Sequence, residues 1–274
     1  MRAAFRIRGL IAIVGFLISL GLTAQPALAQ PETITIAAAN SLKDALRKVL
    51  PLFEAEHRNI NVRVIYGPSQ TLRSQIEQGA PVDIFLPSLF EEIDQLEAKG
   101  LIIQGTKRAF AATSLVLITG TALPAPISTL QDLQTIPIRH IAVGDPKTSS
   151  VGKVSAQFLK YSKLEPKLKS QYVLGEHSRA VLDLVAKGEA EIGVVYRTDA
   201  ISNPGVRILA TAPVGSHTPV RYGVAAAWTA QNITAAGDFI EFLLSPTIQT
   251  QLQEFGFDRV SPEVGFAQRE EVKP

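Results

Sequence analysis

The sequence has no cysteine among its 274 residues. Disulfides are therefore excluded, and stability has to come from packing alone. A lipid anchor on an N-terminal cysteine is excluded for the same reason. Histidine is also scarce, because His57, His140, His177 and His217 are the whole set, and none has a metal-ligand spacing. Without clustered histidine, aspartate or tyrosine ligands, capture of a metal cation is disfavoured.

The common signatures of enzymes are missing as well. There is no G-x-S-x-G nucleophile elbow, no Walker loop and no G-x-G-x-x-G dinucleotide fingerprint. His177 stands next to Ser178, which could suggest a base and a nucleophile, but adjacent side chains seldom point the right way for that role. We therefore expect a protein that is not an enzyme and has no cofactor. A transcriptional effector domain is disfavoured because no helix-turn-helix precedes the chain's main body.

The N-terminal segment has the layout of a secretory signal peptide. Three arginines, Arg2, Arg6 and Arg8, precede an uncharged apolar run over 10–22, and Ala27-Leu28-Ala29 provides a small-residue cleavage site. The run is shorter than the ~20 residues of a membrane anchor. We predict a signal peptide over 1–29, cleavage after Ala29 and a periplasmic location.

Charge in the rest of the chain is balanced. The leader holds three of the 27 basic residues and no acid, which leaves 24 basic against 25 acidic residues. This balance gives no reason to expect binding to nucleic acid or to an anionic membrane. About 245 residues suffice for one large or two modest hydrophobic cores.

Short apolar strands alternate with amphipathic helices, which predicts an α/β fold with largely parallel sheets. Strands are predicted over 33–39, 62–66, 82–86, 114–118, 138–143 and 192–196, and the segment after residue 205 is β-like. Pro51 should kink or stop the first helix. Ser88-Leu89-Phe90-Glu91 predicts a capping box. Two helices close the chain; the last opens at Ser245-Pro246 and ends at Gly256, before a charged tail over 267–274 that we expect to fray.

Small hydrogen-bonding residues recur where predicted strands lead into helices. They are Asn40-Ser41, Ser69-Gln70-Thr71, Thr148 to Gly152, and Ser178, and another buried strand ends on Tyr196. Any one such serine is most simply an N-cap, and a lone tyrosine is most simply a buried ring. As a group they favour ligand binding, because ligands of open α/β sheets bind beyond the carboxyl ends of the strands.

Helix N-termini offer free N–H groups and partial positive charge, so several facing one another would form a cage of neutral donors around an anion. A fully ionised tetrahedral oxyanion needs only donors. Monoprotonated phosphate would also need an acceptor for its proton. Asp145 and Glu176 lie near these loops, so phosphate stays open as an alternative, although we interpret both residues as turn or solvent-facing positions. Sulfate also stays open, because the size of the cage would separate it from other oxyanions and the sequence does not give that size.

Four blocks, AAANSLKDAL, SQTLRSQIEQGAPVDIF, IAVGDP and GEAEIGVVYRTDA, resemble the periplasmic molybdate-binding proteins of ABC importers across residues 32–260. The resemblance implies a two-lobed type II periplasmic-binding fold with two hinge crossings. Lobe one would comprise 30–112 and 223–274, and lobe two 113–222, with each lobe a mostly parallel sheet flanked by helices.

In that family serine hydroxyls, backbone N–H groups and a tyrosine hydroxyl hold molybdate. Matched by motif, the resemblance implies molybdate ligands at Ser41, Ser69, the N–H groups of Val151 and Ser178, and the phenol of Tyr196. Molybdenum would be bound only as molybdate, with no direct metal ligand.

The sequence also departs from the family's pattern. Asn40 and the hydroxyl of Ser178 could each add a contact, and Pro68 removes an N–H beside Ser69. Pro87-Ser88-Leu89 replaces a small-residue-plus-aspartate turn, which moves the helix cap to Ser88 without touching the ligand.

The implied function is capture of molybdate, with tungstate also expected, and delivery to an inner-membrane ABC permease and its ATPase. We expect a monomer.

Overall fold

The computed structural model describes residues 31–120, 130 and 132–260. The predicted signal peptide with its cleavage site, and the predicted frayed tail over 267–274, lie outside these residues. Within them, the strands form two five-stranded sheets that are flanked by helices. The α/β fold predicted from the sequence is confirmed. No helix in the described part of the chain has the length and apolar character needed to cross a membrane.

The first sheet has the strand order β2-β1-β3-β10-β4. β1 pairs in parallel with β2 and β3, and β10 runs antiparallel between β3 and β4. Four of its five strands therefore share one direction. Its strands are β1 (Glu32–Ala39), β2 (Ile60–Gly67), β3 (Ile84–Leu86), β4 (Arg108–Thr113) and β10 (Val220–Ala226).

The second sheet repeats this pattern with the order β7-β6-β8-β5-β9. β6 is parallel to β7 and β8, while β5 runs antiparallel to β8 and β9. Its strands are β5 (Leu115–Gly120), β6 (Ile141–Gly144), β7 (Tyr172–Gly175), β8 (Ile192–Tyr196) and β9 (Val206–Thr211).

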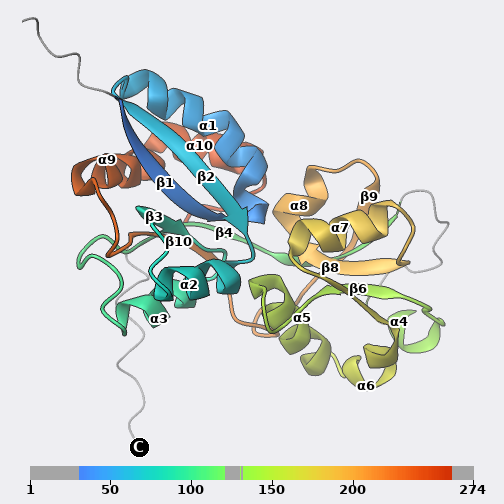
Figure 1. Cartoon of the computed structure of the whole chain (residues 1–274). Helices are drawn as coiled ribbons and strands as arrows, with labels where there is room; N and C mark the ends of the chain where they lie inside the picture. The colour runs from blue at the N-terminus through green and yellow to red at the C-terminus, as the bar shows by residue number, and fades with distance from the viewer. Residues whose placement is uncertain (1–30, 121–129, 131, 261–274) are drawn as a thin grey trace, which may run out of the picture. The chain divides into compact units, whose positions relative to one another are not determined.

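Helices cover both faces of each sheet, as Figure 1 shows. On the first sheet, α1, α9 and α10 pack on one face and α2 and α3 on the other; on the second, α5 and α6 pack on one face and α7 and α8 on the other. The helices are α1 (Lys43–Glu56), α2 (Ser69–Glu77), α3 (Glu91–Glu97), α4 (Asp132–Thr135), α5 (Ser150–Tyr161), α6 (Glu165–Leu168), α7 (Ser178–Ala186), α8 (Arg197–Ile201), α9 (Ile233–Leu244) and α10 (Pro246–Glu254), with short 3-10 turns η1 (Asn40–Leu42) and η2 (Lys169–Gln171).

The chain passes between the sheets twice. It leaves the first sheet after β4 and enters the second at β5, and it returns after β9 to form β10. We call the part built on the first sheet the first half and the part built on the second sheet the second half. The lobe boundaries implied at 112/113 and 222/223 stay predictions.

Of the two effects predicted for Pro51, a stop of the helix is wrong, because α1 does not end there. The helix continues to Glu56 with Pro51 in its interior. A proline removes one backbone hydrogen bond and frees the carbonyl four residues earlier, here that of Arg47. Both residues are exposed. Water can therefore satisfy the freed carbonyl, and the apolar side of the helix, with Val49 and Phe53 fully buried, still packs on the sheet.

Candidate functional site

Three neighbouring strands of the first sheet end at the same level. In the parallel registers Ala39 of β1 lies opposite Gly67 of β2, and Ala38 lies opposite Leu86 of β3. The residues that follow these ends are Ser41, Ser69 and Ser88, all of them buried. The sheet therefore delivers three serines to one edge.

The second sheet does the same with its own three parallel strands. Gly144 at the end of β6 lies opposite Gly175 at the end of β7, and β8 ends at Tyr196. α5 begins just beyond β6, and α7 begins just beyond β7. This edge therefore carries the N-termini of two helices and one phenol.

The residues after these six strand ends line one pocket. All five predicted ligand residues are among them: Ser41, Ser69, Val151, Ser178 and Tyr196. The remaining lining residues are Ala39, Asn40, Gly67, Pro68, Ser88, Ser149, Ser150 and His177. Among the residues that the structure describes, no lysine, arginine, aspartate or glutamate lines this pocket. Its cavity is about 10 Å³, which is room for about one water molecule.

Ser88 occupies the middle of a row of hydroxyls. Its Oγ lies 3.3 Å from Ser69 Oγ and 3.2 Å from the Tyr196 phenol oxygen, and its backbone N–H donates to Ser69 Oγ at 3.1 Å. The prediction that Ser88 caps the next helix was wrong. α3 begins at Glu91, with Phe90 at the N-cap position and no side-chain cap. The other serines were identified as small polar residues beyond a strand end. Ser88 meets the same criterion, because β3 ends at Leu86.

The third serine of the first half, Ser41, accepts a hydrogen bond from a residue of the core. The phenol of Tyr222 in β10 donates a hydrogen bond to Ser41 Oγ at 2.8 Å. Tyr222 is fully buried and does not line the pocket. Burial raises the pKa of this phenol well above its usual value, so it is a neutral donor at physiological pH.

The start of α5 lies close to the end of β6. Ser149 is the N-cap, and its hydroxyl accepts from the Gly152 N–H at 3.2 Å. A Cβ on Gly152 would lie 2.4 Å from the carbonyl of Asp145, so only glycine allows this close approach to the end of β6. Val151, between these two residues, belongs to the first turn, where backbone N–H groups lack helical acceptors.

α7 is capped by His177 rather than by a serine. Its Nδ1 accepts from the Ala180 N–H at 3.1 Å, and Ser178 is the first helical residue. Burial lowers the pKa of His177, and the capping bond requires an unprotonated Nδ1. The only titratable side chain of the pocket besides Tyr196 is therefore neutral near pH 7.

Two further side chains of the pocket have unused donors. In the described part of the chain, the Asn40 side-chain nitrogen and the Ser150 hydroxyl are buried without a hydrogen-bond partner. Unpaired buried polar atoms are costly and uncommon in folded proteins. Both atoms belong to residues that line the pocket, where a ligand with acceptor oxygens could satisfy them.

Three ion pairs are formed by residues close in sequence to the pocket lining. In each pair a basic residue of the second half contacts an acidic residue of the first half. The pairs are Lys153 with Glu91, Arg179 with Asp44, and Arg197 with Asp258. The basic residues lie one or two positions after Val151, Ser178 and Tyr196, so each second-half ligand candidate has an ion pair to the first half beside it.

Arg179 also forms an ion pair with a buried carboxylate. Asp199 in α8 is fully buried and lies 2.8 Å from Arg179 Nε. Burial raises the pKa of Asp199 to about 6, against the opposing effect of the Arg179 charge. The two acids left open by the sequence are turn and surface groups: the Asp145 carboxylate accepts from the Lys147 N–H at 2.9 Å, and Glu176 is exposed.

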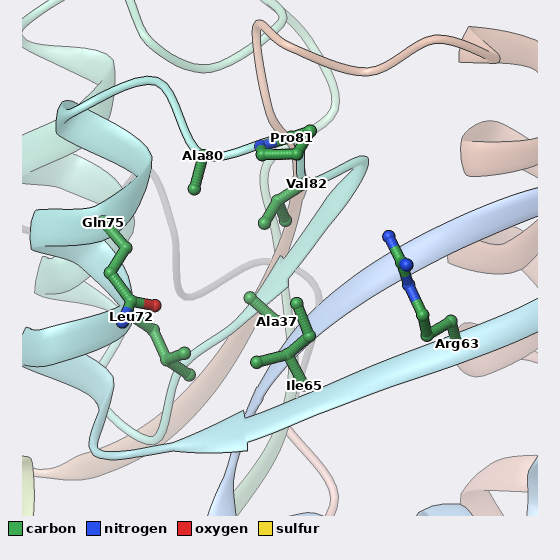
Figure 2. A pocket seen from close by; sticks show the side chains of 8 residues that line it. All are labelled: Ala37, Arg63, Ile65, Leu72, Gln75, Ala80, Pro81 and Val82. Atoms are coloured by element: carbon green, nitrogen blue, oxygen red, sulfur yellow. The ribbon is translucent and has the colours of Figure 1, made fainter.

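A second, larger cavity of about 200 Å³ lies away from these strand ends, between β2, α2 and the loop before β3 (Figure 2). Its lining is mostly apolar: Ala37, Arg63, Ile65, Leu72, Gln75, Ala80, Pro81 and Val82. Arg63 donates to Thr35 Oγ1 at 2.8 Å. Figure 2 shows Arg63 and Gln75 on opposite sides of it, so its polar groups do not converge.

No group of three or more histidine, aspartate or glutamate side chains in the described ranges is arranged to hold a metal ion. The chemistry of the small pocket is that of neutral hydrogen-bond donors at strand ends and helix N-termini. This arrangement suits an anion with acceptor oxygens.

Comparison with known proteins agrees with this chemistry. Residues 34–258 match the family model of the bacterial extracellular solute-binding proteins. The chain is 31% identical to the molybdate-binding protein ModA of Escherichia coli, with 84% of this chain and 91% of that protein covered. It is 30% identical to the ModA of Haemophilus influenzae, covering 82% and 89%.

A solved structure with the same fold is the periplasmic molybdate-binding protein of Azotobacter vinelandii. The TM-score is 0.75 at 20% identity, with 83% of this chain and all of that chain covered. This match confirms the predicted periplasmic-binding fold, and membership of a solute-binding family agrees with the expectation that the protein is not an enzyme. The chain belongs to the bacterial extracellular solute-binding proteins, and among them it is similar to molybdate-binding members.

Proposed function

We propose that this protein captures molybdate, and with it tungstate, in the small pocket between its two halves. The observation that carries the proposal is the convergence of uncharged donors from six strand ends, with no lysine, arginine or carboxylate among the lining residues. Hydrogen bonds to a charged group contribute about 1.5 to 3 kcal/mol each, so several neutral donors suffice to hold a dianion. The similarity to two molybdate-binding proteins at about 30% identity supports molybdate over other oxyanions.

The proposed ligands are the five residues named from the sequence together with Ser88. The hydroxyls of Ser41, Ser69 and Ser88 approach the anion from the first half. The N–H groups of Val151 and Ser178 and the phenol of Tyr196 approach it from the second half. Asn40 and Ser150 are candidates for additional donors, because their unpaired polar atoms belong to the same pocket.

Binding requires the hydroxyl row to open. A cavity of about 10 Å³ is too small for an ion with four oxygens. Molybdate would replace the contacts that the Ser88 hydroxyl makes with the hydroxyls of Ser69 and Tyr196, and these hydroxyls would turn from one another to the ion. Because these donors belong to both halves, all are satisfied together only when both halves contact the ion. The ligand therefore favours the arrangement in which the halves are held together.

The wider role follows from the family. We propose that the mature protein is a monomer in the periplasm, that it has no cofactor, and that it delivers molybdate to an ABC permease driven by its ATPase. The ligand-bound arrangement would be what the permease recognises.

The test is calorimetric titration of the mature protein with molybdate, tungstate, sulfate and phosphate in parallel. We expect heat of binding with molybdate and tungstate at one site per chain and much weaker binding of sulfate and phosphate. Preferential binding of sulfate or phosphate would contradict the assignment to molybdate while leaving an oxyanion receptor. Absence of binding by all four anions would contradict the proposed function.

A further inference from the structure

Tyr222 lies behind the pocket lining, and in the described part of the chain its hydrogen bond to the lining is made to Ser41. Its ring is fixed by aromatic neighbours, with ring centroids 5.1 Å from Phe257, 6.2 Å from Phe110 and 6.2 Å from Tyr196. Its phenol donates to Ser41 Oγ at 2.8 Å from within the core. The phenol is therefore held in place by packing and by β10, independently of any ligand.

A serine hydroxyl has one proton to donate and two lone pairs that accept. In Ser41, one lone pair is used by Tyr222, and among the described residues the hydroxyl has no other hydrogen bond. Ser69 is in a similar position, because the backbone N–H of Ser88 can only donate and bonds to Ser69 Oγ at 3.1 Å. In both serines a donor of the protein occupies one lone pair, which leaves the hydroxyl proton available to donate into the pocket.

We propose that Tyr222 is a positioning residue that holds the Ser41 hydroxyl as a donor toward the oxyanion, and that the Ser88 N–H does the same for Ser69. The inference rests on the proposed function, since it concerns the same pocket. A hydroxyl that accepts one hydrogen bond is polarised and donates a stronger one. It also leaves each of these two serines one fewer lone pair to offer to a protonated anion, which favours ions that carry no proton.

A double-mutant cycle with molybdate as the probe tests the proposal. The variants are Tyr222→Phe, Ser41→Ala and the double variant, with Tyr172→Phe as the control. The Tyr172 hydroxyl lies in β7 and has no hydrogen-bond partner in the described part of the chain. We expect Tyr222→Phe to weaken binding by roughly two- to twelvefold, the effect of one neutral hydrogen bond. In the Ser41→Ala background the same change should have no further effect, because Tyr222 acts through Ser41. Tyr172→Phe should bind like the wild type.

Equal losses for Tyr222→Phe in both backgrounds would overturn the inference, since they would indicate a general structural role. An unchanged affinity of Tyr222→Phe or of Ser41→Ala would overturn it as well. If Tyr222→Phe does not fold, a crystal structure of the wild type with molybdate decides: Ser41 Oγ must lie within hydrogen-bonding distance of both Tyr222 and a molybdate oxygen. Failure of the wild type to bind any oxyanion would instead contradict the proposed function itself.

Discussion

The Ser88 hydroxyl lies 3.2 Å from the phenol oxygen of Tyr196, although the two residues are 108 positions apart and lie at the ends of strands in different sheets. Both side chains are almost fully buried, so this contact is made in the interior of the pocket. Ser88 also reaches Ser69, and it thereby connects candidate ligands of the first half with one of the second half.

We therefore expect Ser88→Ala to weaken molybdate binding. Loss of a hydroxyl that we propose bonds directly to the charged oxyanion should cost about 1.5 to 3 kcal/mol of binding free energy. Isothermal titration measures the effect. The matched control is Ser74→Ala in α2, whose hydroxyl accepts only from Gln78 at the surface. An affinity of Ser88→Ala equal to that of the control would remove Ser88 from the ligand set.

Removing either of two other proposed ligands should have an effect of similar size. Tyr196→Phe and Ser41→Ala each delete a hydroxyl that we propose bonds directly to the charged oxyanion, so each should cost about 1.5 to 3 kcal/mol of binding free energy. Thermal unfolding of the unliganded variants checks that the fold persists. If neither change altered molybdate affinity, the pocket would not be the binding site.

The ion pairs between the halves should support ligand binding modestly. Lys153 pairs with Glu91 across the two halves, and both side chains are about one-third exposed. We expect Lys153→Met to lower molybdate affinity by about 0.2 to 1 kcal/mol, with a smaller effect at high salt because exposed charges are screened. Lys169→Met is the control, since Lys169 pairs with Glu165 within the second half. Equal effects of the two variants at every salt concentration would show that the pair does not couple the halves.

Asp199 should give stability an unusual dependence on pH. Burial raises its pKa to about 6, above the ~3.9 of an unfolded aspartate, so between these values the folded state binds more protons than the unfolded state. The contribution of Asp199 to the free energy of unfolding is therefore most favourable below about pH 4. It declines as the pH rises through 6.

Urea unfolding of the wild type and of Asp199→Asn between pH 4 and 8 measures this contribution as the difference between the two profiles. The exposed Asp183→Asn provides the control, and its profile should run parallel to that of the wild type. A difference between wild type and Asp199→Asn that does not change with pH would contradict the raised pKa.

Much of the fold could be predicted because the local signals agree with the tertiary structure. β8 was predicted with its observed bounds, and α10 begins after Ser245 and ends before Gly256, as its cap and its glycine indicated. β4 was not predicted because Arg108–Thr113 carries no clear alternation. It is a strand because it pairs with β10, more than a hundred residues away in the chain.

The pocket was predicted in outline because parallel strand ends lie at one edge of a sheet whatever their loops contain. Five of the six proposed ligand residues were identified from the sequence by this rule and by resemblance. Ser88 was missed because it and the next three residues form a plausible capping box. A local pattern cannot show that the Ser88 hydroxyl has one partner beyond another strand of the first sheet and a second partner in the other half. The role of Tyr222 was missed for the same reason, since its partner Ser41 is 181 positions away.

The path of β10 has a consequence for how the chain reaches this structure. The second sheet is built from one continuous stretch of the chain. The first sheet also needs β10, which lies between β3 and β4 but follows all five strands of the second sheet in the sequence. During synthesis, which starts at the N-terminus, the chain can therefore complete the second sheet before the first. Pairing between strands that are far apart in the sequence is slow. Until β10 has formed, the edges of β3 and β4 that pair with it have no partner strand. Folding of the first half should thus be the late step, and Tyr222, which arrives with β10, sets the Ser41 hydroxyl only when that step is finished.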